Sequence, residues 1–180
     1  MKTILVDCDD TIVNTLEVWV DELNSTYNLN VKYEDIKEWD MSKSFPMLSW
    51  DEIYRPLTIP SFWDKVKPKE NAVEVLQRLS HNFEIYIVTA TDYRIIKEKV
   101  ERVIKKYFPC IDDQHIITSY NKKILKGDYI IDDNFDNLRG GYSVHNFLFP
   151  APHNKNINEF PEAFRVKDWL HIERLINVIR

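Results

Sequence analysis

Two short acidic runs stand out because each directly follows an apolar stretch of the chain. Asp7 and Asp9 follow the residues ILV, and Asp132 and Asp133 follow YII. Carboxylates that share one cleft repel each other unless they keep protons or bind a cation. Oxygen ligands without a Cys/His cluster favour a hard ion, and Mg²⁺ accepts phosphate oxygens while keeping waters. The acidic runs therefore predict a Mg²⁺ site that serves a phosphate group.

Two more residues fit such a site. Thr89 ends the apolar run FEIYIV, and Lys122 precedes the second acidic run. A hydroxyl and exposed backbone amides donate to phosphate oxygens, and an ammonium group offsets negative charge. One carboxylate would attack, a second would move the proton, and the cation would neutralise developing charge. Each piece alone is commonly structural, but their shared position near strand ends indicates a phosphoryl-transfer site.

The composition excludes other phosphate sites and several kinds of partner. The chain of 180 residues has only three glycines, Gly127, Gly140 and Gly141, too few for a Walker loop or a G-x-G-x-x-G loop. The net charge is -5 and the isoelectric point is about 5.6. Without a long basic run, neither nucleic acid nor an anionic membrane is expected as a partner.

The cysteines and the absence of long apolar runs predict a protein of the reducing interior of the cell. Cys8 and Cys110 form no C-x-x-C pair, and two cysteines in this chain suggest reduced thiols rather than a disulfide scaffold. No signal peptide precedes the first apolar run, and no run reaches about 18 apolar residues. We expect a soluble, cytoplasmic protein. His81 is expected to be a turn residue. For His153 a place near the site is one alternative, but a surface position in a loop is favoured.

The elements that must position these residues follow an α/β pattern. Short apolar runs alternate with helical periodicity, which indicates a parallel sheet. The expected strands are 2–7, 83–88, 115–118, 128–131 and 143–149. Apolar residues recur with helical spacing over 72–79, 96–107 and 169–179, with Asp92 and Asp168 as expected N-caps. Ligands of open parallel sheets bind beyond the carboxyl ends of the strands, where the acidic runs fall.

Residues 12–67 interrupt this alternation and are expected to form a small helical cap. The core would then comprise residues 1–11 and 68–180. A first helix, capped by Asn14 or Thr15, is followed by a stretch rich in aromatic residues and prolines. Aromatic rings stack on nucleobases with little regard to base identity. The substrate-binding candidates are Trp39, Phe62 and Trp63, with Tyr33, Trp50 and Tyr54 as weaker ones; the alternative is that these rings form the cap's own core.

Four motifs in this order resemble those of the haloacid dehalogenase (HAD)-like phosphatases. They are ILVDCDDT at 4–11, IVTAT at 87–91, Lys122, and YIIDD at 129–133. The resemblance implies a HAD-like α/β fold, a Rossmann-like parallel sheet with helices on both faces. A closer resemblance is to the 5'(3')-deoxyribonucleotidases of cytosolic type C. It rests on Lys122 standing ten residues before Asp132, on LFPAPHN at 148–154, and on the aromatic cap.

The resemblance also implies roles for individual residues. Asp7 would be the nucleophile that forms an aspartyl-phosphate, and Asp9 the general acid and then base. The metal would be held by the Asp7 carboxylate, the Asp9 carbonyl and Asp133. Thr89 would bind phosphate, and Lys122 would neutralise it. Asp132 and Asp136 would support the metal ligands from behind.

Two positions depart from the pattern of the family. Asp10 stands where a glycine is common, so the loop carries an extra carboxylate that would point away from the phosphate. Ala90, a further substrate-binding candidate, stands where the deoxyribonucleotidases carry a serine, which removes one donor to the phosphate.

The resemblance implies a Mg²⁺-dependent phosphomonoesterase that hydrolyses (deoxy)nucleoside monophosphates, acting as a monomer or a homodimer on a small molecule. Two alternatives stay open: a phosphatase of the same chemistry for a sugar phosphate or another small phosphoester, and a non-catalytic binding protein with this fold. The intact acidic residues argue against a binding protein. A dehalogenase is disfavoured because cleavage of a carbon–halogen bond needs neither Asp9 nor a metal.

Overall fold

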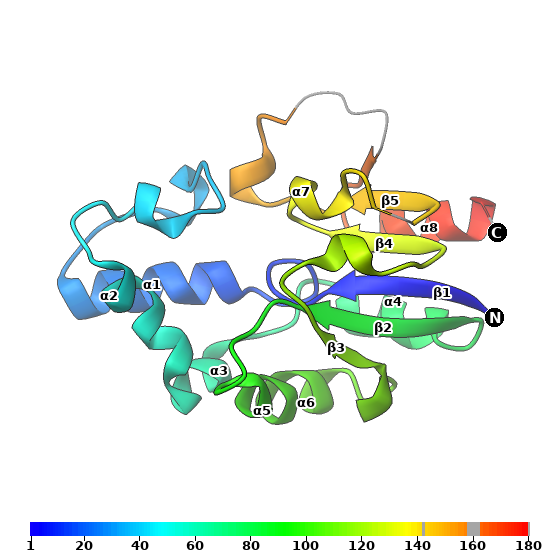
Figure 1. The fold of residues 1–180 in the computed structure, drawn as a ribbon, viewed down its shortest axis with the longest axis horizontal. Helices are drawn as coiled ribbons and strands as arrows, with labels where there is room; N and C mark the ends of the chain where they lie inside the picture. The colour runs from blue at the N-terminus through cyan, green and yellow to red at the C-terminus, as the bar shows by residue number, and fades with distance from the viewer. Residues whose placement is uncertain (142, 158–162, 180) are drawn as a thin grey trace.

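One parallel sheet organises the protein, seen in a computed structural model that describes residues 1–141, 143–157 and 163–179. The described strands run in the order β3-β2-β1-β4-β5-β6, and all neighbours are parallel. They are β1 (Lys2–Asp7), β2 (Phe83–Thr89), β3 (Ile116–Thr118), β4 (Tyr129–Asp132), β5 (His145–Leu148) and β6 (Phe164–Arg165). In Figure 1 their carboxyl ends point left, toward the segment that follows β1. The predicted fold class is confirmed.

Both faces of the sheet carry a hydrophobic cluster because alternate strand residues point to opposite sides. In β1, Ile4 and Val6 belong to the larger cluster, and Leu5 belongs to the smaller one. Residues of α4 (Ala72–Leu79) and α8 (Trp169–Ile179) pack into the larger cluster. On the other face, α7 (Phe135–Leu138) contributes to the smaller cluster.

A third helical segment also packs on the larger cluster, but its helix is less regular than the sequence pattern predicts. The periodicity over 96–107 predicts one helix. The structure instead has α5 (Ile96–Lys99), a π-helical turn (Val100–Ile104) and α6 (Lys105–Tyr107). A π-turn holds more residues than an α-turn. The side chains that follow it therefore point to other sides of the helix than they would in an unbroken α-helix.

The segment between β1 and α4 builds a hydrophobic cluster of its own. It contains α1 (Thr15–Tyr27), α2 (Trp50–Tyr54) and α3 (Pro60–Lys65), with 3₁₀ turns at Tyr33–Asp35, Met41–Lys43 and Arg55–Thr58. Its cluster consists of Leu16, Val20, Leu23, Ile36, Met41, Phe45 and Ile53. The end of the segment differs, because Phe62, Trp63 and Val66 pack into the larger cluster of the sheet. The division into a core and a cap at 12–67 stays a prediction.

The two ends of this segment lie side by side. The backbone amide of Asn14 donates to the Lys67 carbonyl at 3.0 Å. The backbone amide of Lys67 donates to Oδ1 of the Asn14 side chain at 2.8 Å. The Asn14 side chain therefore does not cap α1 as expected. The amide of Leu16 in the first turn of α1 instead donates to the Asp10 carboxylate, at 3.1 and 3.0 Å from its two oxygens.

Of the other two predicted N-caps, Asp168 caps its helix and Asp92 does not. Asp168 caps α8 as expected, since its carboxylate accepts the His171 amide at 2.7 Å. Asp92 accepts the Arg94 amide at 2.8 Å, but α5 begins only at Ile96, so Asp92 caps a turn ahead of the helix.

Strand β6 was not predicted, because its two residues are too few to show a pattern. Within the described part of the chain, none of the helices has the length and apolar character needed to cross a bilayer.

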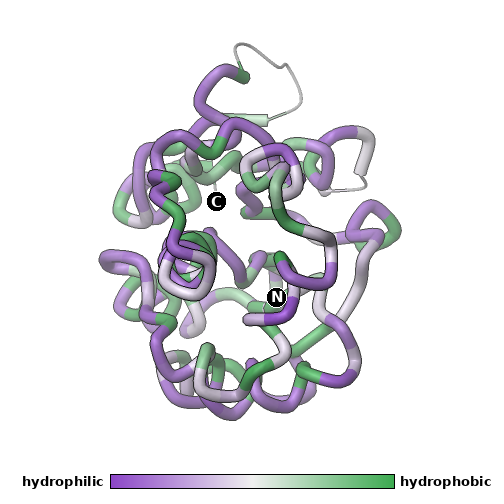
Figure 2. Tube along the Cα trace, turned by 90° about the vertical axis from the view of Figure 1, so that its left-hand side faces the viewer, coloured by the Kyte–Doolittle hydropathy of each residue, from purple (hydrophilic) through white to green (hydrophobic). Residues whose placement is uncertain are grey.

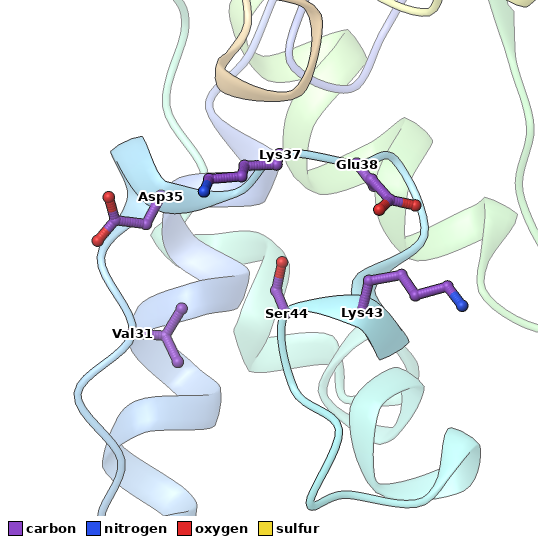
Figure 3. A pocket seen from close by; sticks show the side chains of 6 residues that line it. All are labelled: Val31, Asp35, Lys37, Glu38, Lys43 and Ser44. Atoms are coloured by element: carbon purple, nitrogen blue, oxygen red, sulfur yellow. The ribbon is translucent and has the colours of Figure 1, made fainter.

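A pocket lies within the inserted segment, lined by Val31, Asp35, Lys37, Glu38, Lys43 and Ser44 (Figure 3). Most of these side chains are exposed to solvent, and none of the predicted site residues lines the pocket. Figure 2, a view from the side of this segment, shows hydrophilic residues along much of the outer chain. The pocket is therefore distinct from the acidic cluster at the sheet edge.

Candidate active site

The strand order brings the predicted residues to one edge of the sheet. Asp7, Thr89 and Asp132 are the last residues of β1, β2 and β4, and β1 lies between the other two strands. Asp7 pairs in register with Val88, so Thr89 lies one residue further along. The loop after β1 carries Asp9, and Asp133 follows β4 directly. Residues distant in sequence thus meet because parallel strands end at the same edge.

Lys122 is the cation between two of these carboxylates. Its Nζ atom lies 2.5 Å from Oδ1 of Asp7 and 2.8 Å from Oδ2 of Asp132, and all three residues are buried. Burial raises the pKa of Asp7 well above its usual value, and the positive charge of Lys122 opposes that rise. Burial acts to lower the pKa of Lys122, but the two carboxylates outweigh it and raise that pKa. The predicted neutralising lysine therefore lies beside the predicted nucleophile.

Asp133 has partners that were only partly expected. Nε2 of His153 lies 3.2 Å from Oδ2 of Asp133, and Nδ2 of Asn154 donates to the Asp133 carbonyl at 2.8 Å. Although burial acts to raise the pKa of Asp133, the His153 contact reverses the effect and lowers it. His153 is thus not the free surface residue that was expected, since only 7% of its side chain is exposed. The segment LFPAPHN contributes these two contacts to Asp133, and the Thr11 hydroxyl donates to its Oδ1 at 3.5 Å.

Three carboxylates fit a divalent metal ion. Asp7, Asp132 and Asp133 each offer one oxygen atom, and these atoms lie within 4.8 Å of one another. All three residues are buried, and a cation at this place would offset the charge that Lys122 leaves unpaired. Asp132 is also held by Nδ2 of Asn137 at 3.1 Å from each carboxylate oxygen. The expectation that Asp136 supports the site is not met, because Asp136 is exposed and Asn137 makes this contact instead.

The side chain of Asp9 lies in a different network from the carboxylates of Asp7, Asp132 and Asp133, and the predicted metal ligation by the Asp9 carbonyl stays a prediction. Its Oδ1 accepts the Thr15 hydroxyl at 2.7 Å, and its Oδ2 lies 2.5 Å from Nζ of Lys99. The same Nζ lies 2.9 Å from Oγ1 of Thr89. Sequence reasoning missed Lys99. One signal was available, because Lys99 stands four residues from both Ile95 and Val103 and so interrupts the apolar face of its helix.

Asp10 is buried and faces α1 rather than the carboxylate cluster. Its φ of 55° is left-handed, which explains why glycine is common at this position. Nζ of Lys69 lies 3.8 Å from its Oδ1, in addition to the amide of Leu16. Burial, assisted by the charge of Asp133, raises the pKa of Asp10 to about 8, against the opposing effect of Lys69. The extra carboxylate is therefore used to cap a helix.

The aromatic candidates differ sharply in exposure. Phe62 and Trp63 are each 2% exposed and pack edge-to-face at 5.1 Å, whereas Trp39 is 59% exposed. Burial of Phe62 and Trp63 favours the alternative that they are core residues, and their substrate contacts stay a prediction. Tyr33 is half-buried, and its hydroxyl lies 3.5 Å from Nζ of Lys69, the lysine that contacts Asp10. Ala90 follows Thr89 and is half-buried.

Solved structures share the fold of this chain. A haloacid dehalogenase-like hydrolase from Streptococcus pneumoniae matches with a TM-score of 0.66 and 14% identity, covering 100% of this chain and 99% of the other. A HAD family hydrolase from Deinococcus radiodurans, with bound phosphate and sodium, matches with a TM-score of 0.66 and 12% identity over 99% and 96% of the two chains. The fold is that of the haloacid dehalogenase-like hydrolases.

Sequence comparisons narrow the class to one family. The model of the family "5' nucleotidase, deoxy (pyrimidine), cytosolic type C protein" matches residues 1–180. A 5'(3')-deoxyribonucleotidase from Clostridium acetobutylicum is 35% identical, covering 95% of this chain and 93% of its own. A 5'(3')-deoxyribonucleotidase from Bacillus subtilis is 34% identical over 96% and 97%. The chain belongs to the 5' nucleotidase, deoxy, cytosolic type C family, as the sequence motifs indicated.

Proposed function

We propose that this protein is a Mg²⁺-dependent phosphomonoesterase that hydrolyses deoxyribonucleoside monophosphates to nucleosides and phosphate. The observation that carries the proposal is the buried group of Asp7, Asp132 and Asp133 around Lys122 at the carboxyl edge of the sheet. Such a group supplies both a carboxylate nucleophile and positive charge for a phosphate. Relatives named 5'(3')-deoxyribonucleotidases give the substrate class.

The residues divide the reaction into two displacements at phosphorus. In the first, a carboxylate oxygen of Asp7 bonds to phosphorus while the bond to the leaving oxygen breaks, and Asp9 gives that oxygen its proton. In the second, Asp9 takes a proton from water, the water oxygen bonds to phosphorus, and the Asp7 carboxylate is released. Lys122 and Thr89 bind the phosphate oxygens throughout. A bound Mg²⁺ supplies charge that neutralises the phosphate as negative charge develops.

The inserted segment after β1 is the proposed source of substrate selectivity. The residues at the sheet edge address the phosphate, so they treat phosphomonoesters alike. Discrimination between leaving groups must come from the surroundings, and binding energy from remote parts of a substrate can also raise turnover. Trp39 is exposed and Tyr33 is half-buried, so these rings offer a free surface to a base, whereas Phe62 and Trp63 are buried in the core.

A panel of phosphomonoesters tests this function. It would contain deoxyribonucleoside 5'- and 3'-monophosphates, ribonucleoside monophosphates, sugar phosphates and p-nitrophenyl phosphate, each with Mg²⁺ and with excess EDTA. We expect the highest kcat/KM for deoxyribonucleotides and loss of activity in EDTA. Mn²⁺ or Co²⁺ should restore part of it, because both accept oxygen ligands. A higher kcat/KM for a sugar phosphate would contradict the substrate class, and undiminished activity in EDTA would contradict the metal.

A further inference from the structure

One buried cation has no part in the mechanism described above. Lys99 ends α5, is only 2% exposed, and its Nζ lies against Asp9 and two threonines. The distances are 2.5 Å to Oδ2 of Asp9, 2.9 Å to Oγ1 of Thr89 and 2.7 Å to Oγ1 of Thr91. Burying a lysine is costly unless its charge is paired, and here the Asp9 carboxylate supplies the opposite charge.

The contacts use all the hydrogen-bonding capacity of Lys99. A lysine ammonium has three N–H donors and no acceptor, and three oxygens surround Nζ within hydrogen-bonding distance. The Trp63 ring covers it from another side, with the ring centre 5.0 Å from Nζ. No donor is left for a phosphate oxygen. Lys99 must therefore act through its neighbours.

Asp9 is fixed by contacts to both of its carboxylate oxygens. Oδ1 accepts from Thr15 and Oδ2 accepts from Lys99, yet 30% of the Asp9 side chain is still exposed. These partners hold the carboxylate in one orientation while leaving it accessible from solvent. The Thr89 oxygen also accepts from Lys99, and Oγ1 of Thr89 lies 3.4 Å from Oδ2 of Asp9 and 3.1 Å from Oγ1 of Thr91, so Thr89 belongs to the same network.

We propose that Lys99 is a positioning residue that, together with Thr15, holds the side chain of Asp9 in the one orientation from which it transfers a proton. The inference rests on the proposed phosphomonoesterase function. In the first displacement the Asp7–phosphorus bond forms and the bond to the leaving oxygen breaks, while Asp9 in its protonated form gives its proton to that oxygen and becomes the carboxylate that pairs with the Lys99 ammonium. Lys99 neither gains nor loses a proton in this step.

A pair of aryl phosphates separates positioning from general damage. The leaving group of p-nitrophenyl phosphate needs little protonation, whereas phenyl phosphate and deoxyribonucleotides have more basic leaving oxygens. kcat/KM reports the steps up to departure of the leaving group. Lys99→Met should therefore lower kcat/KM roughly 10²-fold for phenyl phosphate and the nucleotide, and by clearly less for p-nitrophenyl phosphate. Lys97→Met, on an exposed face of the same helix, is the matched control and should leave all three values unchanged.

The double variant completes the test. Once Asp9→Asn has removed the proton donor, adding Lys99→Met should cost little more, because the two residues act as a unit. If Lys99→Met does not fold by circular dichroism, Lys99→Gln gives the same comparison with a neutral donor. Equal losses on all substrates, or additive losses in the double variant, would overturn the role of Lys99.

The aryl phosphates keep this result separate from the substrate class. A wild-type protein that cleaves aryl phosphates but no nucleotide would refute the nucleotidase proposal, while the comparison of leaving groups would still test Lys99. A wild-type protein without any phosphomonoesterase activity would refute both.

Discussion

Nζ of Lys122 lies 2.5 Å from Oδ1 of Asp7, and at most 8% of either side chain is exposed. This contact opposes the rise in the pKa of Asp7 that burial causes, and so favours the ionised carboxylate, which is the form that can attack phosphorus. The same ammonium reaches Asp132 at 2.8 Å. One lysine therefore offsets charge on two of the three carboxylates that are placed for a metal.

Replacing Lys122 by methionine should make the stability of the protein depend more strongly on Mg²⁺. Removal of one partner from a buried ion pair costs about 3–5 kcal/mol, because the carboxylates remain buried without their cation. Added Mg²⁺ should then raise the Tm of the variant more than that of the wild type, since the site has become more negative. Thermal unfolding with and without MgCl₂ checks this. The exposed neighbour provides the control Lys123→Met, and an equal Mg²⁺ effect in all three proteins would contradict the arrangement.

Asp7→Asn should abolish turnover and any covalent phosphoenzyme, because an amide is a poor nucleophile. Intact-mass measurement after rapid acid quenching detects the added phosphoryl group in the wild type. Asp9→Asn should still form the phosphoenzyme from p-nitrophenyl phosphate, but should hydrolyse it slowly because the base for water is missing. Asp51→Asn, at an exposed position of α2, is the control. Near-normal turnover by Asp7→Asn would show that another group attacks.

The aromatic rings of the inserted segment should separate into two kinds. Phe62→Ala should cost about 3–5 kcal/mol of stability because it empties a packed core position. Trp39→Ala should change stability by no more than about 0.5 kcal/mol, because Trp39 is largely exposed. If Trp39 contacts the base, its loss should lower kcat/KM for a deoxyribonucleotide more than for p-nitrophenyl phosphate. Unfolding by denaturant and kinetics on both substrates decide this, and equal kinetic losses would remove Trp39 from the substrate site.

Trp169→Phe should weaken the link between α8 and the catalytic loop. Nε1 of Trp169 donates to the buried Thr11 carbonyl at 3.0 Å. Phenylalanine keeps much of the apolar packing but leaves this carbonyl unpaired, which costs about 1–3 kcal/mol. Urea unfolding measures the loss. A variant as stable as the wild type would show that water or a shift of the loop replaces the bond.

The two thiols should differ in reactivity. Cys8 is fully buried, and burial raises its pKa, so it should stay protonated and inaccessible in the folded protein. Cys110 is half-buried, and burial also raises its pKa, so it should react slowly. Mass spectrometry after iodoacetamide should show at most one label on the native protein and two after unfolding. Cys110→Ser should remove the native label, and rapid double labelling would contradict the burial of Cys8.

The strands and the acidic site were predictable because their signals are local. Asp7 and Asp132 end apolar runs, and parallel strands bring their carboxyl ends to one edge. Asp168 was correctly placed as a cap for the same reason, since capping is decided within one turn. The predicted roles of these site residues await the experiments above.

Contacts set by tertiary packing were not predictable in the same way. His153 meets Asp133 only because a 3₁₀ turn at Pro152–Asn154 folds back over the end of β4. The segment LFPAPHN resembles the family, but its local pattern does not show which residue His153 contacts. The burial of Phe62 and Trp63 likewise depends on where α3 docks, and the π-turn at Val100–Ile104 changes which side chains of that stretch face the core.

The paired hydrogen bonds between Asn14 and Lys67 make a closed neck for the segment between β1 and α4. Once a neck is closed, the entropy of the enclosed chain changes slowly, by about 0.6 kcal/mol for each doubling of loop length. Natural variation can therefore lengthen, shorten or replace the enclosed helices without moving the backbone that carries Asp7. The freedom ends at Phe62, where the segment begins to share the packing of the sheet. Substrate preference and catalytic chemistry can thus evolve at different rates within one short chain.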